Sequence, residues 1–137
     1  MSTDGFTIAV FVTRKPDLSP DAFQDYWENH HVPLLRRLGG SRFPRSHIRH
    51  YLKRDSQAPD FPAAVLVGEP TDFTYDGFAI INFESEAAFQ QFVPVMSTTE
   101  VAEDEDRFTD RSKMRAVVLG EVFKHIYKVF FPATWEQ

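Results

Sequence analysis

The sequence predicts an α+β domain whose strands and main helices follow the order β-α-β-β-α-β. Three observations lead to this prediction: short segments rich in β-branched and aromatic residues, longer segments with apolar residues at helical spacing, and Ser, Gly or Pro at the boundaries. A length of 137 residues suits one domain. We therefore treat 1–137 as a single domain with a core of about 6–127 and a C-terminal tail at 128–137.

Four segments have the composition of strands. They are short, contain many β-branched or aromatic residues, and cover 6–13, 46–53, 77–83 and 115–127. The connection between the second and third strands, about 54–75, is longer than most loops in compact domains. It is expected to be a functional flap or a variable insertion.

The first helix is expected over about 20–38. Ser19 is a favourable N-cap, and apolar residues follow at helical spacing. Pro33 lies inside this helix and lacks the N–H group that would bond the carbonyl of the preceding turn. A bend is therefore expected beside His30 and His31.

The second helix is expected to begin after Ser85. The acidic segment 99–113 predicts a further short helix, from which Phe108 must turn toward the core. Its charged residues at 104–106 and 110–111 are most simply a solvated face. The apolar stripe of the second helix consists of Phe89, Phe92, Val93 and Met96.

This order of elements is the ferredoxin-like split pattern. A four-stranded antiparallel sheet of this kind carries helices on one face, and the apolar strands predict that the other face is covered as well. Two sheets packed face to face would cover it and form a homodimer, a dimeric α/β barrel. Coverage by the chain's own tail is the alternative.

Composition excludes several classes of function. A net charge of −5 and a pI near 5.5 argue against a nucleic-acid partner, which requires a basic face. The chain contains no cysteine, so thiolate chemistry and disulfides are absent. No apolar run approaches the ~20 residues of a membrane span, and a cytoplasmic protein without membrane contact is expected. Fourteen Phe predict an aromatic pocket or interface.

Histidine is the first candidate for chemistry. The sequence has no phosphate-binding loop, dinucleotide fingerprint, nucleophile elbow or zinc spacing, which leaves general acid–base catalysis. Helical spacing does not decide which of His30 and His31 points inward. Adjacent helical side chains diverge by roughly 100°, so no metal site is expected there.

A second candidate group lies on the strand 46–53. Alternation places His47, Arg49 and Tyr51 on one face and His50 on the other. An imidazole, a cation and a phenol in a row would suit an acidic phenolic substrate. A solvated sheet face is the simpler alternative.

The segment Tyr26-Trp27-Glu28-Asn29-His30-His31-Val32-Pro33-Leu34 resembles the signature of the EthD-domain family, in which an aromatic and an acidic residue precede His-x-Pro-Leu. The chain is most similar to the fungal polyketide-tailoring branch, over roughly 6–122. The other matching features are Arg14-Lys15-Pro16, Phe43-Pro44-x-Ser46-His47-x-Arg49-x-Tyr51 and Asp104-Glu105-x-x-Phe108-x-Asp110-Arg111.

This resemblance implies a dimeric α/β barrel that works without a metal or organic cofactor. The branch includes decarboxylases of atrochrysone-type carboxylic acids and relatives assigned to dehydration, cyclisation or cycloaddition of polyketides. The resemblance selects His31 over His30, supports His47, and makes Asp110 a third catalytic candidate. The candidates for substrate binding are Tyr26, Trp27, Arg49, Tyr51 and Phe108.

The resulting hypothesis is a cofactor-independent lyase, a decarboxylase of an aromatic polyketide acid. Arg49 or Tyr51 would stabilise charge on an oxygen, and His31 or His47 would move the proton. The hypothesis predicts that His31 and His47 open into one cavity. A dehydratase or cyclase, a cofactor-free anthrone oxygenase and a non-catalytic polyketide-binding protein remain alternatives.

Overall fold

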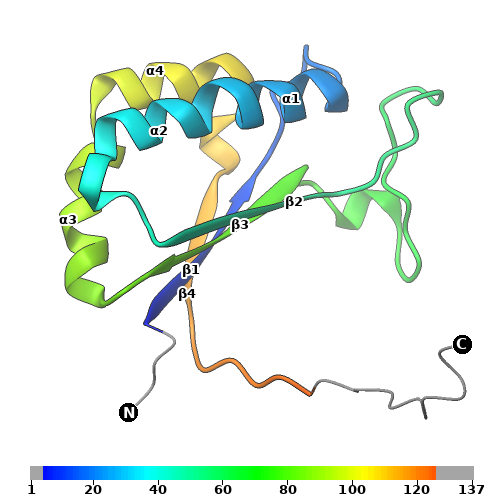
Figure 1. Ribbon diagram of the computed structural model, residues 1–137. Helices are drawn as coiled ribbons and strands as arrows, with labels where there is room; N and C mark the ends of the chain where they lie inside the picture. Colours follow the sequence, from blue (N-terminus) through cyan, green and yellow to red (C-terminus); the bar gives the residue numbers. More distant parts are fainter. Residues whose placement is uncertain (1–4, 126–137) are drawn as a thin grey trace, which may run out of the picture.

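A computed structural model describes residues 5–125 and shows one antiparallel sheet with the strand order β2-β3-β1-β4. The helices α1, α2 and α4 lie over one face of this sheet, and α3 lies toward one end (Figure 1). This arrangement confirms the predicted ferredoxin-like α+β fold. The strands are β1 (Phe6–Val12), β2 (Ser46–Tyr51), β3 (Gly77–Phe83) and β4 (Arg115–Leu119).

The first helical segment consists of α1 (Pro20–Tyr26), a π-helical turn η1 (Trp27–His31) and α2 (Val32–Gly39). Ser19 caps it as expected, because its side chain accepts a hydrogen bond from the Ala22 N–H group. Where the sequence predicted a bend beside His30 and His31, the structure has a π turn, in which the Val32 N–H group donates to the Trp27 carbonyl.

The remaining helices follow the third strand. Ser85 caps α3 (Glu86–Met96), and Thr98 caps α4 (Thr99–Phe108). Both caps accept a backbone N–H group three residues ahead, as N-cap side chains do. Three short 3₁₀ turns complete the described helices: η2 (Gly40–Arg42), η3 (Pro70–Asp72) and η4 (Arg111–Lys113).

Three strands are shorter than predicted, β1 by one residue and the other two by more. β2 ends at Tyr51 and not at 53, because its partner β3 begins at Gly77, opposite Tyr51. β4 ends at Leu119, which pairs with Thr7. Because β1 begins at Phe6, only one residue of β1 lies beyond this pair to continue the hydrogen bonding. The prediction of strand over 120–125 was therefore wrong, and 126–127 lies outside the described residues.

The core lies between the helix layer and the sheet. Alternate residues of β1 and β3 point toward the helices, and large aromatic side chains from the helices pack on them. Burial of this apolar surface is the main force that holds the two layers together. The buried core consists of Ile8, Val12, Phe23, Trp27, Leu35, Ala79, Ile81, Phe83, Phe92, Val95, Val101 and Phe108.

The opposite face of the sheet carries no helix (Figure 1). Ile48 and Val117 on this face are 53% and 52% exposed, so the face presents apolar side chains to solvent. His50 lies on the same face, where its ring stacks on Phe78 with a centroid distance of 5.0 Å. Within residues 5–125, no helix is long and apolar enough to cross a bilayer.

Candidate functional site

A cavity of about 290 Å³ lies between the helix layer and the sheet. Most of its wall is apolar and comes from β1, β3 and the facing helices. Its ionisable lining residues are His31, His47 and Glu105. The cavity is close in size to the smaller ligand sites of proteins, which begin at roughly 300 Å³. Both predicted histidines therefore line one cavity, as expected.

His31 projects from the π turn and is 5% exposed, whereas His30 is exposed. Its Nδ1 atom lies 2.8 Å from Oδ2 of Asp104 on α4. A carboxylate only accepts hydrogen bonds, so Nδ1 carries the proton and the Nε2 lone pair is left for chemistry. Burial lowers the pKa of His31, and Asp104 partly offsets this effect.

Asp104 is 6% exposed and anchors His31. Its second oxygen accepts a hydrogen bond from the Tyr26 hydroxyl at 2.6 Å. Burial acts to raise the pKa of Asp104, but the hydrogen bonds from Tyr26 and His31 outweigh it, and the pKa lies below its usual value. Asp104 therefore remains a carboxylate near neutral pH.

Glu105 is the second acidic residue beside His31. Its Oε2 atom lies 3.9 Å from His31 Nε2, and its side chain is 19% exposed. Arg111 approaches the other oxygen at 3.3 Å. Burial raises the pKa of Glu105, and Arg111 opposes that change.

His47 lies on the sheet side of the cavity, on β2. The Arg49 guanidinium lies behind it, with Nη1 at 2.8 Å from His47 Nδ1. Glu28 holds that guanidinium through two contacts of 2.6 and 2.9 Å, and Tyr51 donates its hydroxyl proton to the same carboxylate at 2.5 Å. Burial, followed by the charge of Arg49, lowers the pKa of His47 to about 4.

The structure separates the predicted substrate-binding residues into two groups. Trp27 and Phe108 line the cavity beside the histidines. Tyr26, Arg49 and Tyr51 are not among its lining residues and lie one layer behind, where they hydrogen-bond Asp104 or Glu28. Through these bonds the three side chains lie behind the histidines, and Tyr51 also lines a second cavity beside α1.

Asp110 does not line the cavity. Its side chain caps the short turn η4 and accepts hydrogen bonds from the backbone and hydroxyl groups of Ser112, at 3.2 and 2.6 Å. This cavity therefore gives no support to the catalytic role predicted for Asp110, which stays a prediction. The carboxylates beside His31 are Asp104 and Glu105.

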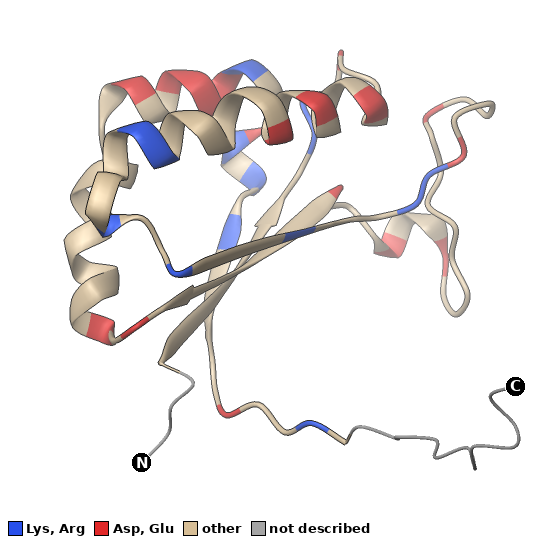
Figure 2. Ribbon diagram, in the orientation of Figure 1, with Lys and Arg blue, Asp and Glu red and all other residues tan. Residues whose placement is uncertain are grey.

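Sequence reasoning missed Asp104, which it assigned to a solvated acidic face. Acidic residues are indeed frequent along α1 and α4 (Figure 2). However, Asp104 lies three residues after Val101 and four before Phe108, which are both buried. A carboxylate on the apolar stripe of a helix requires a buried partner. The spacing of Asp104 from Val101 and Phe108 could therefore have indicated that Asp104 is buried and paired.

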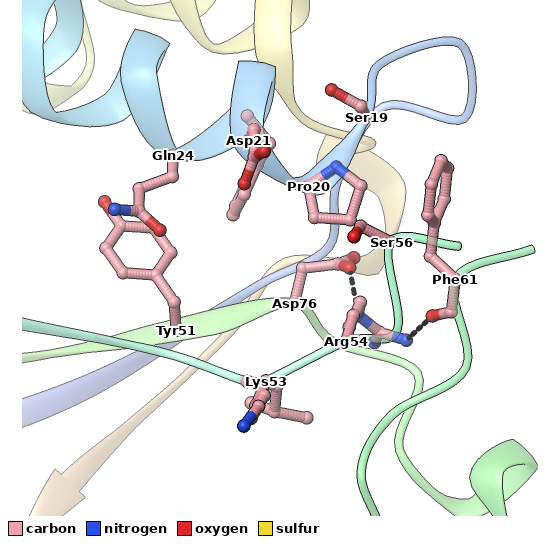
Figure 3. Close-up of a pocket in the computed structure, with 12 residues that line it drawn as sticks. Ser19, Pro20, Asp21, Gln24, Tyr51, Lys53, Arg54, Ser56, Phe61 and Asp76 are labelled. Atoms are coloured by element: carbon pink, nitrogen blue, oxygen red, sulfur yellow. Dashed lines mark hydrogen bonds and ion pairs between the residues drawn. The ribbon is translucent and has the colours of Figure 1, made fainter. Parts of the chain in front are cut away.

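A second, larger cavity of about 420 Å³ lies beside the start of α1 and the end of β2 (Figure 3). Neither His31 nor His47 lines it. Its Arg54 contacts Asp76 at 2.7 Å and donates to the Phe61 carbonyl at 2.9 Å (Figure 3). These contacts hold the long loop against the sheet, and they pair two charged residues of this cavity, Arg54 and Asp76, with each other.

Comparison with known families identifies the domain. The model of the EthD domain matches residues 15–112, which include the π turn, β2 and α4. The chain belongs to the EthD domain family. A search of curated proteins found no match.

Solved structures share the fold at low sequence identity. An EthD family protein of Bacillus halodurans is 18% identical, with a TM-score of 0.51 over 85% of this chain and 99% of that one. HapK of Hahella chejuensis is 18% identical, with a TM-score of 0.50 over 91% and 99%. An Arabidopsis thaliana protein is 11% identical, with a TM-score of 0.53 over 88% and 99%.

Proposed function

We propose that this EthD-domain protein is a cofactor-independent lyase that decarboxylates an aromatic polyketide acid of the atrochrysone type. The observation that carries the proposal is one apolar cavity lined by both His31 and His47. Apolar and aromatic walls suit a planar ring system, and a buried imidazole provides a proton acceptor near neutral pH.

His31 is the proton carrier in this proposal. Nε2 accepts the proton of the substrate's carboxylic acid, and the carboxylate then loses CO2 as its C–C bond breaks. The electron pair of that bond moves onto the oxygen of the neighbouring carbonyl group, which produces an enolate. His31 then returns its proton to the carbon. The reaction is balanced without any further reactant, and Asp104 stabilises the transient imidazolium.

The test is carbon dioxide release from an atrochrysone-type carboxylic acid by the purified protein, followed together with oxygen uptake. His31→Gln should lower kcat by ~10²–10⁴-fold, the usual contribution of a general acid–base group. His30→Gln, which changes the exposed neighbour, is the matched control and should retain activity. Oxygen uptake without CO2 release would instead indicate an oxygenase. Tight binding without turnover would indicate a binding protein.

We also propose that the chain forms a homodimer through the outer face of the sheet. Ile48 and Val117 are half exposed there, and a second copy would cover them. Val117→Asp should yield a monomer in light scattering at micromolar concentration. Leu66→Asp, which changes a 99% exposed residue of the long loop, should leave the dimer intact. A monomeric wild-type chain would contradict this assignment.

A further inference from the structure

The contact between Arg49 and His47 determines which ring nitrogen of His47 carries the proton. Arg49 Nη1 lies 2.8 Å from His47 Nδ1. A guanidinium has N–H donors and no acceptor, so His47 Nδ1 must be the acceptor of this hydrogen bond. A neutral imidazole that accepts at Nδ1 carries its proton at Nε2.

Arg49 is held too firmly to leave this position easily. Glu28 binds it through two oxygens, and a further N–H group donates to the backbone carbonyl of His47 at 2.8 Å. Its side chain is 19% exposed, and arginine does not lose its proton in proteins. Protonation of His47 Nδ1 would place an N–H group against this cation. The charged or ionisable groups that act on His47 are Arg49, Glu28 and His31.

The two histidines therefore present opposite groups to one cavity. Asp104 makes His31 an acceptor at Nε2, and Arg49 makes His47 a donor at Nε2. We propose that neutral His47 donates its Nε2–H hydrogen bond to the substrate oxygen on which negative charge develops. Arg49 is the positioning residue that fixes this tautomer.

This assignment rests on the proposed function and narrows its substrate class. An acceptor and a neutral donor in an apolar space suit a carbonyl compound that passes through an enolate, such as a β-keto acid or an ortho-hydroxyaryl acid. The donor stabilises charge on the carbonyl oxygen and keeps its own proton throughout. His31 alone moves a proton, to the carbon from which CO2 has left.

The tautomers can be read directly from the ¹⁵N NMR spectrum of histidine-labelled protein, without turnover. The His47 signals, identified by their loss in His47→Gln, should show protonated Nε2 and bare Nδ1 from pH 8 to pH 5. His31 should show the reverse pattern near neutral pH. A His47 ring with protonated Nδ1, or an imidazolium at pH 6, would overturn the assignment. This NMR result does not depend on lyase activity, which is measured separately by CO2 release.

Two pairs of variants test the donor. His47→Gln retains an N–H donor and should keep kcat within ~10-fold, whereas His47→Leu should lower it by ~10²–10³-fold, as loss of an oxyanion donor does. Arg49→Lys should preserve the tautomer, and Arg49→Leu should produce a mixture of tautomers with lower kcat. Equal kcat for His47→Leu and wild type, or an unchanged tautomer in Arg49→Leu, would overturn the proposal.

Binding provides a readout if the wild type releases no CO2. The probe is 1,8-dihydroxyanthraquinone, a planar ketone with neighbouring hydroxyl groups, titrated by fluorescence. His47→Leu should weaken its binding at least ~10-fold relative to His47→Gln, the range expected for a lost hydrogen bond. Equal affinity of the two variants would reject the donor. If His47→Leu binds the probe more weakly but the wild type releases no CO2, the lyase activity is rejected and the role of His47 as a hydrogen-bond donor is retained.

Discussion

The helix wall and the sheet wall of the cavity each contribute one histidine, but the groups behind the two rings have opposite charges. On the helix side, the Asp104 carboxylate contacts Nδ1 of His31, and on the sheet side, the Arg49 guanidinium contacts Nδ1 of His47. The same side chain thus becomes an acceptor on one wall and a donor on the other. The residue behind each ring, and not the histidine itself, therefore determines whether the ring accepts or donates.

The largest expected effect is on stability at low pH. The pKa of His47 is lowered to about 4, whereas an unfolded chain has a His pKa near 6.5. Between these values the unfolded state binds more protons, so the free energy of unfolding falls as pH decreases from about 6.5. The stability of wild type relative to His47→Gln should fall by on the order of 3 kcal/mol from pH 7 to pH 4.

Urea unfolding of both proteins at each pH measures this difference. The pKa of His31 is lowered too, so its contribution changes in the same direction and is present in both proteins. The comparison therefore isolates His47. Parallel stability curves for wild type and His47→Gln would show that His47 titrates normally and that the sheet wall does not suppress its charge.

The next effect concerns the helix wall. Asp104→Asn removes the charge that raises the pKa of His31, so His31 becomes a weaker base. We expect kcat at neutral pH to fall by roughly 10- to 100-fold, a part of the ~10²–10⁴-fold contribution of acid–base catalysis. Glu103→Gln removes an exposed charge from the same helix and serves as the control. Equal kcat for the two variants would show that His31 needs no carboxylate.

A smaller effect is expected one layer behind the sheet wall. Tyr51→Phe removes one hydrogen bond to Glu28 but leaves both contacts between Glu28 and Arg49. We expect a loss of about 1 kcal/mol in the free energy of unfolding and a kcat lower by only about two- to fivefold. A loss as large as that of Arg49→Leu would mean that Tyr51 reaches the substrate itself.

The smallest effect is expected from His50, on the same strand as His47 but on the other face. His50→Gln should leave kcat within about twofold, since His50 is exposed and stacks on Phe78 away from the cavity. The measurement is kcat from steady-state kinetics of His50→Gln and His47→Leu, two variants of the same strand. A strong loss of kcat in His50→Gln would place the reaction on the outer face of the sheet.

Much of the fold was predictable because its signals are local. Ser19 and Ser85 mark helix starts, and β-branched and aromatic residues mark the strands. The alternation of a strand placed His47, Arg49 and Tyr51 on one face. The sequence left open which face meets the helices, and the structure shows that it is this one. The strand ends were less predictable, because a strand stops where its partner stops.

The choice between His30 and His31 shows where local rules were insufficient. Helical spacing alone left both open, and the family resemblance selected His31, which the structure buries. The π turn that contains it changes the usual spacing along the helix, so simple counting of 100° per residue does not hold across it.

The sequence by itself determined the type and order of the elements, the polar face of β2 and the candidate histidines. Only the tertiary structure decided their partners. Asp104 is 73 residues from His31, and Glu28 is 21 from Arg49. Whether a carboxylate at such a distance is solvated or buried against an imidazole depends on how helices pack over a sheet. That packing arises from the whole apolar core and not from any local pattern of residues.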